Sequence, residues 1–174
     1  MNGKHELYDA EKLQIWAIGQ SHIDLAWLWR LGQTINKAKI TCSKAAFHVK
    51  QIPEYSFTFS QPVMLEWLRT EHPEVFKSVK EAIATGRFEL QGGMWAECDA
   101  KVPSGESFCR QRLYGQRYYL KHFGKLAEIE WLPDSFGYNN NIPQFAQKSG
   151  SRYFYTQKIS RSEEHTSELQ SPNT

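Results

Sequence analysis

The sequence lacks the features that mark exported and membrane-spanning proteins. Its three cysteines, Cys42, Cys98 and Cys109, are an odd number without a CxxC spacing, which argues against a disulfide framework and a structural zinc knuckle. No apolar run reaches the roughly eighteen residues of a membrane span. The N-terminal stretch MNGKHELYDAEKLQ contains no signal-peptide pattern. We therefore expect a soluble, cytoplasmic protein.

The chain also lacks a strong charge of one sign. Its formal net charge is only +2, and basic residues are interspersed with acidic ones, so neither nucleic acid nor a membrane surface is an expected partner. Aromatic residues, by contrast, make up 14% of the sequence, which suits both a hydrophobic core and a sugar-binding cleft. Small molecules or glycans are therefore the expected partners, and the oligomeric state is left open.

Apolar periodicity and turn residues predict an α/β chain with about five βα repeats and parallel strands. Pro73 falls inside one helical segment, which predicts two helices or a kink there. The predicted strands cover residues 14–19, 55–60, 88–92, 128–132 and 153–157, and the predicted helices cover about 34–51, 63–85, 105–123 and 142–148.

Polar residues follow the predicted strands. His22 and Asp24 stand two apart after the first strand, so on an extended chain their side chains emerge on one face and can share a divalent metal. Asp134 follows the fourth strand inside Pro-Asp-Ser, and carboxyl ends of parallel strands meet at one rim. Taken alone, His22 reads as a half-buried structural histidine and Asp134 as a turn former. Together they predict a metal site.

Four separated motifs in the sequence resemble those of a known protein family. HIDLAW, GGMWAE, PSGES and WLPDSFGY occur in this order between about Ile15 and Ser160. The chain resembles the N-terminal catalytic domain of glycoside hydrolase family 38 α-mannosidases, and among them the bacterial and cytosolic-type branch. The resemblance implies a seven-stranded βα barrel, of which about five repeats would be present here. It also implies a hydrolase in mannose and carbohydrate metabolism that cuts terminal α-mannosidic bonds in glycans.

The resemblance also implies a ligand set and a mechanism. His22, Asp24 and Asp134 would bind one metal, most simply Zn²⁺, with Co²⁺ or Mn²⁺ possible for such ligands. Asp134 would also be the nucleophile of a retaining glycosidase, which forms a covalent glycosyl-enzyme. A metal near the C2 and C3 hydroxyls would favour the distorted ring and help to select mannose.

Three further positions match substrate contacts of the family. Trp27 corresponds to a residue against the mannose ring and Phe136 to a residue beside the nucleophile, although either side chain could equally be a core aromatic. Lys158 stands where relatives in other branches have an arginine, so a point charge replaces a planar fork. All three are assigned to substrate binding.

The third strand is followed by Trp95, Glu97 and Asp99, which are harder to assign. Trp95 fits a cleft wall and a core position equally well. For Glu97 and Asp99 we favour an ordinary polar loop.

Two residues that the family uses in catalysis are missing from this sequence. The family's final histidine ligand and its general acid have no counterpart between Tyr138 and Ser160. We therefore expect residues 1–160 to be part of a catalytic barrel that is inactive by itself. Residues 161–174, RSEEHTSELQSPNT, abandon the apolar pattern and are interpreted as a disordered tail translated from a sequencing adapter.

Two other functions remain open. A metal-dependent carbohydrate deacetylase has a related barrel with Asp and His at strand ends, but it would need an HxxxH motif at a helix start, which this sequence does not contain. A noncatalytic glycan-binding module would use the aromatic side chains alone, and its binding would be indifferent to chelation.

Overall fold

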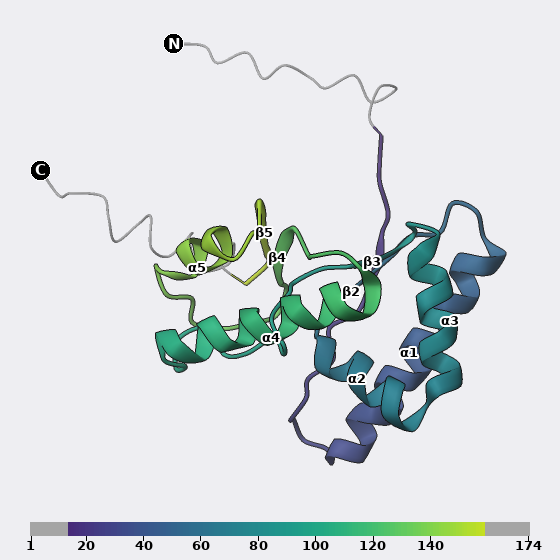
Figure 1. Ribbon diagram of the computed structural model, residues 1–174, viewed down its shortest axis with the longest axis horizontal. Helices are drawn as coiled ribbons and strands as arrows, with labels where there is room; N and C mark the ends of the chain where they lie inside the picture. The colour runs from purple at the N-terminus through teal and green to yellow at the C-terminus, as the bar shows by residue number, and fades with distance from the viewer. Residues whose placement is uncertain (1–13, 159–174) are drawn as a thin grey trace, which may run out of the picture.

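The computed structural model describes residues 14–158, which form a mixed α/β fold (Figure 1). Strands and helices alternate along the chain except where α2 and α3 follow each other directly. The elements are β1 (Gly19–Gln20), α1 (Leu31–Gln51), β2 (Phe57–Phe59), α2 (Pro62–Glu71), α3 (Pro73–Ala84), β3 (Phe88–Leu90), α4 (Gly105–Phe123), β4 (Ile129–Leu132), α5 (Ile142–Lys148) and β5 (Tyr153–Thr156).

The strands pair in parallel, as the alternating pattern predicts. A three-stranded sheet has the order β1-β2-β3, and a two-stranded sheet contains β4 and β5. The backbone N–H of Gly92, just past β3, donates to the carbonyl of Ile129 at 2.9 Å and connects the two sheets. This bond places the end of β3 beside Ile129, the first residue of β4. A closed or partial barrel remains a prediction.

Two apolar clusters support these sheets. Helices α1, α2 and α3 pack against one another and lie together in Figure 1, away from β4 and β5. Their buried side chains join those of β2 and β3 in the larger cluster, which includes Met64, Leu65, Leu68 and Phe88. Helix α4 contacts α2 and α5, and a smaller cluster lies beside it around Phe108. None of the helices in the described part of the chain combines the length and apolar character that crossing a bilayer requires.

The predicted helices agree well with the observed ones. Pro73 separates α2 from α3, and α5 has the bounds predicted for it. Helix α4 begins after Ser104, whose hydroxyl accepts a hydrogen bond from the Ser107 N–H at 3.3 Å, and it ends at Gly124 with a φ of 71°. Helix α1 begins three residues earlier than predicted, at Leu31. The predictions for residues 1–13 and 159–174, including the disordered tail, lie outside the described residues.

The strand predicted over residues 14–19, whose apolar residues favour burial, is absent for most of that length. Only Gly19 and Gln20 pair with β2, and the side chains of Ile15 and Trp16 are 93% and 84% exposed. The reason lies in the partner strand, because β2 begins only at Phe57 and the chain before it is still turning away from the end of α1. Apolar composition alone therefore does not bury a segment whose neighbour is too short to pair with it.

Helix α4 holds the loop that follows β3. At Gly115 a Cβ atom would lie 2.2 Å from the carbonyl oxygen of Gly93, so only glycine permits this close approach of helix and loop. Gln111, one turn earlier on the helix, accepts two hydrogen bonds from this loop. Its backbone carbonyl accepts from the Trp95 N–H at 2.8 Å, and its side-chain oxygen accepts from the Ala96 N–H at 2.9 Å. The path of the loop toward Glu97 is therefore fixed from the helix side.

A buried ion pair joins α4 to the second sheet. The guanidinium of Arg112 donates to the carboxylate of Glu130 in β4 and to the Gly92 carbonyl, and both charged side chains are almost completely buried. It also donates to the hydroxyls of Ser149 and Ser151 at 2.7 and 2.6 Å. Burial raises the pKa of the Glu130 carboxyl to about 7, although the charge of Arg112 opposes this shift.

Removal of the Arg112 side chain should therefore destabilise the chain strongly. Arg112→Ala leaves a buried carboxylate without its partner, which typically costs about 3–5 kcal/mol. Arg110→Ala is the control, because Arg110 lies on the same helix in an exposed pair with Glu106 and should leave the unfolding midpoint nearly unchanged. Urea unfolding followed by circular dichroism measures both. Equal midpoints for the two variants would contradict this role of Arg112.

Candidate functional site

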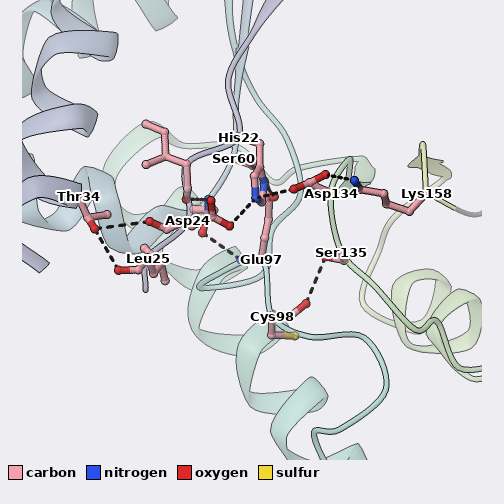
Figure 2. A network of polar contacts seen from close by, with 12 residues as sticks. His22, Asp24, Leu25, Thr34, Ser60, Glu97, Cys98, Asp134, Ser135 and Lys158 are labelled. Atoms are coloured by element: carbon pink, nitrogen blue, oxygen red, sulfur yellow. Dashed lines mark hydrogen bonds and ion pairs between the residues drawn. The ribbon is translucent and has the colours of Figure 1, made fainter. Parts of the chain in front are cut away.

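His22 and Asp24 follow β1 in a loop that α1 holds in place. The hydroxyl of Thr34, a fully buried residue of α1, donates to the carbonyl of Leu25 at 3.0 Å and accepts a hydrogen bond from the Trp29 indole N–H at 2.9 Å. Figure 2 shows the contact between Thr34 and Leu25 to the left of the site. The helix thus fixes the backbone next to Asp24 and, with it, the direction of the Asp24 side chain.

The structure brings together the three residues predicted to bind a metal. His22, Asp24 and Asp134 each offer one ligand atom, and these atoms lie within 4.8 Å of one another. His22 Nε2 lies 3.2 Å from Asp24 Oδ1 and 3.7 Å from Asp134 Oδ2. More than a hundred residues of chain separate Asp134 from the other two, so the fold rather than the local sequence creates this cluster.

Asp134 also meets Lys158, which follows β5. The Lys158 ammonium donates to Asp134 Oδ1 at 2.7 Å, and it lies 4.8 Å from the centre of the Phe136 ring (Figure 2 shows the ion pair). The two carboxylate oxygens thus face different partners, Oδ1 the ammonium and Oδ2 the imidazole. This arrangement fixes the orientation of the carboxylate while leaving it partly exposed.

Glu97 is part of the site, although the sequence favours an ordinary polar loop for it. Its side chain is only 2% exposed, and its carboxylate accepts hydrogen bonds from His22 Nδ1 and from the hydroxyl of Ser60, just past β2. Sequence reasoning assigned Glu97 to a loop and did not consider Ser60. The available signal was position, because each follows a strand at the same edge as His22 and Asp134.

The electrostatic environment of His22 favours its protonated form. Burial by itself would lower the pKa of the imidazole, but the hydrogen bond and charge of Glu97, followed by those of Asp24, outweigh it and raise the pKa to about 9. The same carboxylates that stabilise the added proton on His22 would also stabilise a metal cation bound there instead of that proton. The cluster therefore favours positive charge at this position.

The other residues named from the sequence differ in their exposure and contacts. The rings of Trp27 and Phe136 are 63% and 64% exposed and therefore lie open to solvent near the carboxyl ends of the strands. Trp95 packs edge-to-face on Tyr118, with ring centres 5.6 Å apart, and belongs to the core side of its loop. Asp99 accepts hydrogen bonds from two backbone N–H groups at 2.8 Å, as expected for a turn residue.

This arrangement suits a divalent cation held by one nitrogen and two carboxylate oxygens. Such a mixed donor set is typical of Zn²⁺ and also admits Co²⁺ and Mn²⁺. A partly exposed carboxylate beside that position could in addition react with a bound ligand. The described residues thus contain a candidate site for metal-assisted chemistry on a polar substrate.

Comparison with known sequences agrees with the motifs. The model of the glycosyl hydrolases family 38 N-terminal domain matches residues 12–172. The chain belongs to glycosyl hydrolase family 38. Family 38 relatives include alpha-mannosidase G of Dictyostelium discoideum, 42% identical, and an alpha-mannosidase of Saccharomyces cerevisiae, 44% identical, each over 147 residues. Each alignment covers 84% of this chain but only 14% of the relative.

Solved structures show the same fold. An alpha-mannosidase from Enterococcus faecalis V583 superposes with a TM-score of 0.73 over 80% of this chain and 16% of its own, at 23% sequence identity. Family 38 membership therefore rests on the sequence match, and the fold is supported independently. The chain spans about 14% of the length of the relatives that it matches.

Addition of metal should stabilise the chain through the three clustered ligands. At a free Zn²⁺ concentration of about 100 times Kd, the gain is about 2.7 kcal/mol, which for a chain of this size raises Tm by about 5–10 °C. Excess EDTA should reverse the shift. Differential scanning fluorimetry measures it.

Asp24→Asn should lose most of this shift, because an amide oxygen is a weaker ligand than a carboxylate. Asp99→Asn is the matched control: it makes the same change in a turn outside the cluster, and it should retain the full shift. A full Zn²⁺ shift in Asp24→Asn would show that the metal binds elsewhere.

Proposed function

We propose that residues 1–160 form the N-terminal part of the catalytic barrel of a metal-dependent, retaining α-mannosidase that acts on terminal α-mannosidic bonds in glycans. The observation that carries this proposal is the convergence of His22, Asp24 and Asp134 in a member of family 38. The relatives are α-mannosidases by name, which supports the substrate. Three free cysteines in the described residues support a cytoplasmic location.

The metal would be held by His22 Nε2 and by one oxygen each of Asp24 and Asp134, and we propose Zn²⁺ or, as a substitute, Co²⁺. These residues fit such a cation, because their donor atoms already lie close together and the charge of two carboxylates offsets its charge. When bound, the cation supplies Lewis-acid polarisation of sugar hydroxyl groups.

Asp134 is proposed as the nucleophile. One carboxylate oxygen attacks the anomeric carbon, the glycosidic bond breaks, and the leaving oxygen takes a proton from a carboxylic acid that is not among the described residues. Water then gives a proton to the carboxylate of that same acid and attacks the anomeric carbon, which breaks the bond to Asp134 and gives retention of configuration. Lys158 supports this role because its hydrogen bond keeps one oxygen of Asp134 oriented.

Substrate would be held by the exposed aromatic rings. Trp27 is proposed to pack against the mannose ring, and Phe136 beside Asp134 to cover the reacting centre, since both residues are mostly exposed. Lys158 lies close enough to Phe136 and Asp134 to contact the same sugar. Residues 161–174 are proposed not to contribute, although the family match extends to residue 172.

The proposal is tested with a full-length protein that contains residues 1–160 of this chain. The full-length protein should hydrolyse 4-nitrophenyl α-mannoside, and the α-anomer should be the first product seen by NMR. Asp134→Asn should reduce kcat by about 10³-fold or more, because the covalent route is lost. Asp99→Asn serves as the control and should keep its activity.

The 174-residue chain alone should not turn over this substrate. Hydrolysis by the purified chain that Asp134→Asn abolishes would contradict that expectation. A full-length protein that binds mannosides without cleaving them, and does so equally well in EDTA, would instead indicate a glycan-binding module.

A further inference from the structure

The two ring nitrogens of His22 face different surroundings. Nε2 points toward Asp24 and Asp134, at 3.2 and 3.7 Å, on the partly exposed side where the metal is proposed to bind. Nδ1 points the other way and is in contact with the carboxylate of Glu97 (Figure 2). A neutral imidazole carries its proton on only one nitrogen, so the partner of one nitrogen determines whether the other has a free lone pair.

Glu97 is suited to hold that proton and unsuited to bind the metal itself. Both of its oxygens are engaged, one by His22 Nδ1 and the other by the hydroxyl of Ser60. Its side chain is almost completely buried, whereas the carboxylates of Asp24 and Asp134 are more than a third exposed. Glu97 also lies outside the group of donor atoms that can share a cation.

Gln61 ties Glu97 to the loop that carries His22. Its amide N–H donates to the carbonyl of Ile23 at 2.9 Å, and its side-chain oxygen accepts a hydrogen bond from the Glu97 N–H at 3.2 Å. Gln61 is buried and has a φ of 66°, which is the only positive value of a residue other than glycine in the described part of the chain. A strained backbone of this kind persists where the surroundings require it, often at a functional site.

We propose that Glu97 is a positioning residue that keeps the His22 proton on Nδ1, with Ser60 and Gln61 fixing Glu97 in place, so that the lone pair of Nε2 faces the metal. The proposal rests on the metal site of the proposed function. It assigns Glu97 to the carboxylate–histidine–metal arrangement in which a buried acid orients a ligating imidazole and raises its basicity.

Metal affinity tests this role without any assay of activity. In the 174-residue chain, Glu97→Ala should weaken Co²⁺ binding about 10–100-fold, as measured by competition with a chromophoric chelator. Glu97→Gln should weaken it by less than about 10-fold, because the amide oxygen still accepts the Nδ1–H hydrogen bond. Glu71→Gln makes the same change at an exposed site on α2 and should leave Kd unchanged.

The protonation state provides a second, direct readout. Long-range ¹H–¹⁵N spectra of the zinc-loaded chain should show His22 protonated at Nδ1 and ligated through Nε2, and the signal is assigned among the six histidines by its loss in His22→Ala. This measurement does not use Glu97→Ala, and it therefore tests the proposal even if that variant does not fold. Zinc bound to Nδ1 would overturn the proposal.

Co²⁺ binding by His22→Ala distinguishes failure of the positioning role of Glu97 from failure of the metal site itself. Weaker Co²⁺ binding in His22→Ala together with an unchanged Kd in Glu97→Ala would overturn the positioning role and leave the metal site in place. Unchanged binding in His22→Ala itself would overturn the metal site, and with it the role of Glu97. Loss of affinity in both, with partial retention in Glu97→Gln, is the result expected.

Discussion

The buried guanidinium of Arg112 is the contact on which the arrangement of the two sheets depends. It binds the backbone just past β3, the Glu130 side chain in β4 and two serine hydroxyls between α5 and β5. Burying such a pair is costly, as the raised pKa of Glu130 indicates, so its net contribution to stability is smaller than its contacts suggest. Its main effect is positional, because it sets β4, and hence Asp134, beside the loop that carries Glu97.

The candidate site is a consequence of parallel pairing. In a parallel arrangement every strand presents its carboxyl end at the same edge, so residues far apart in sequence meet there. All five described strands contribute in this way: His22 follows β1, Ser60 follows β2, Glu97 follows β3, Asp134 follows β4 and Lys158 follows β5. Short strands suffice, because helices α1 and α4 fix the loops through side-chain hydrogen bonds to backbone groups. The rigidity of the site thus comes from the helices behind the sheet as much as from the sheet itself.

Sequence reasoning predicted the helices and the parallel strands well, because helix starts and ends have local chemistry such as Ser104, Gly124 and Pro73. It failed at residues 14–18, where apolar residues suggested burial but the neighbouring strand begins too late to pair with them. It anticipated that His22, Asp24 and Asp134 would meet, since strand ends can be located from sequence. It assigned Glu97 to an ordinary loop, because burial of one acidic side chain against another strand depends on the fold and leaves no periodic signal.

The acidic residues of the site differ only through their surroundings. Asp24 and Asp134 remain partly exposed, so a cation or a sugar can replace the water that now solvates them. Glu97 is almost completely buried, and its two oxygens contact a serine hydroxyl and an imidazole, so neither of them faces the open side. The proton of His22 is likewise on the buried side, because the buried Glu97 carboxylate accepts a hydrogen bond from Nδ1 and so keeps the proton on that nitrogen. The order Ser60, Glu97, His22 therefore runs from the protein interior toward the open side, and it leaves Nε2 as the nitrogen that faces incoming ligands.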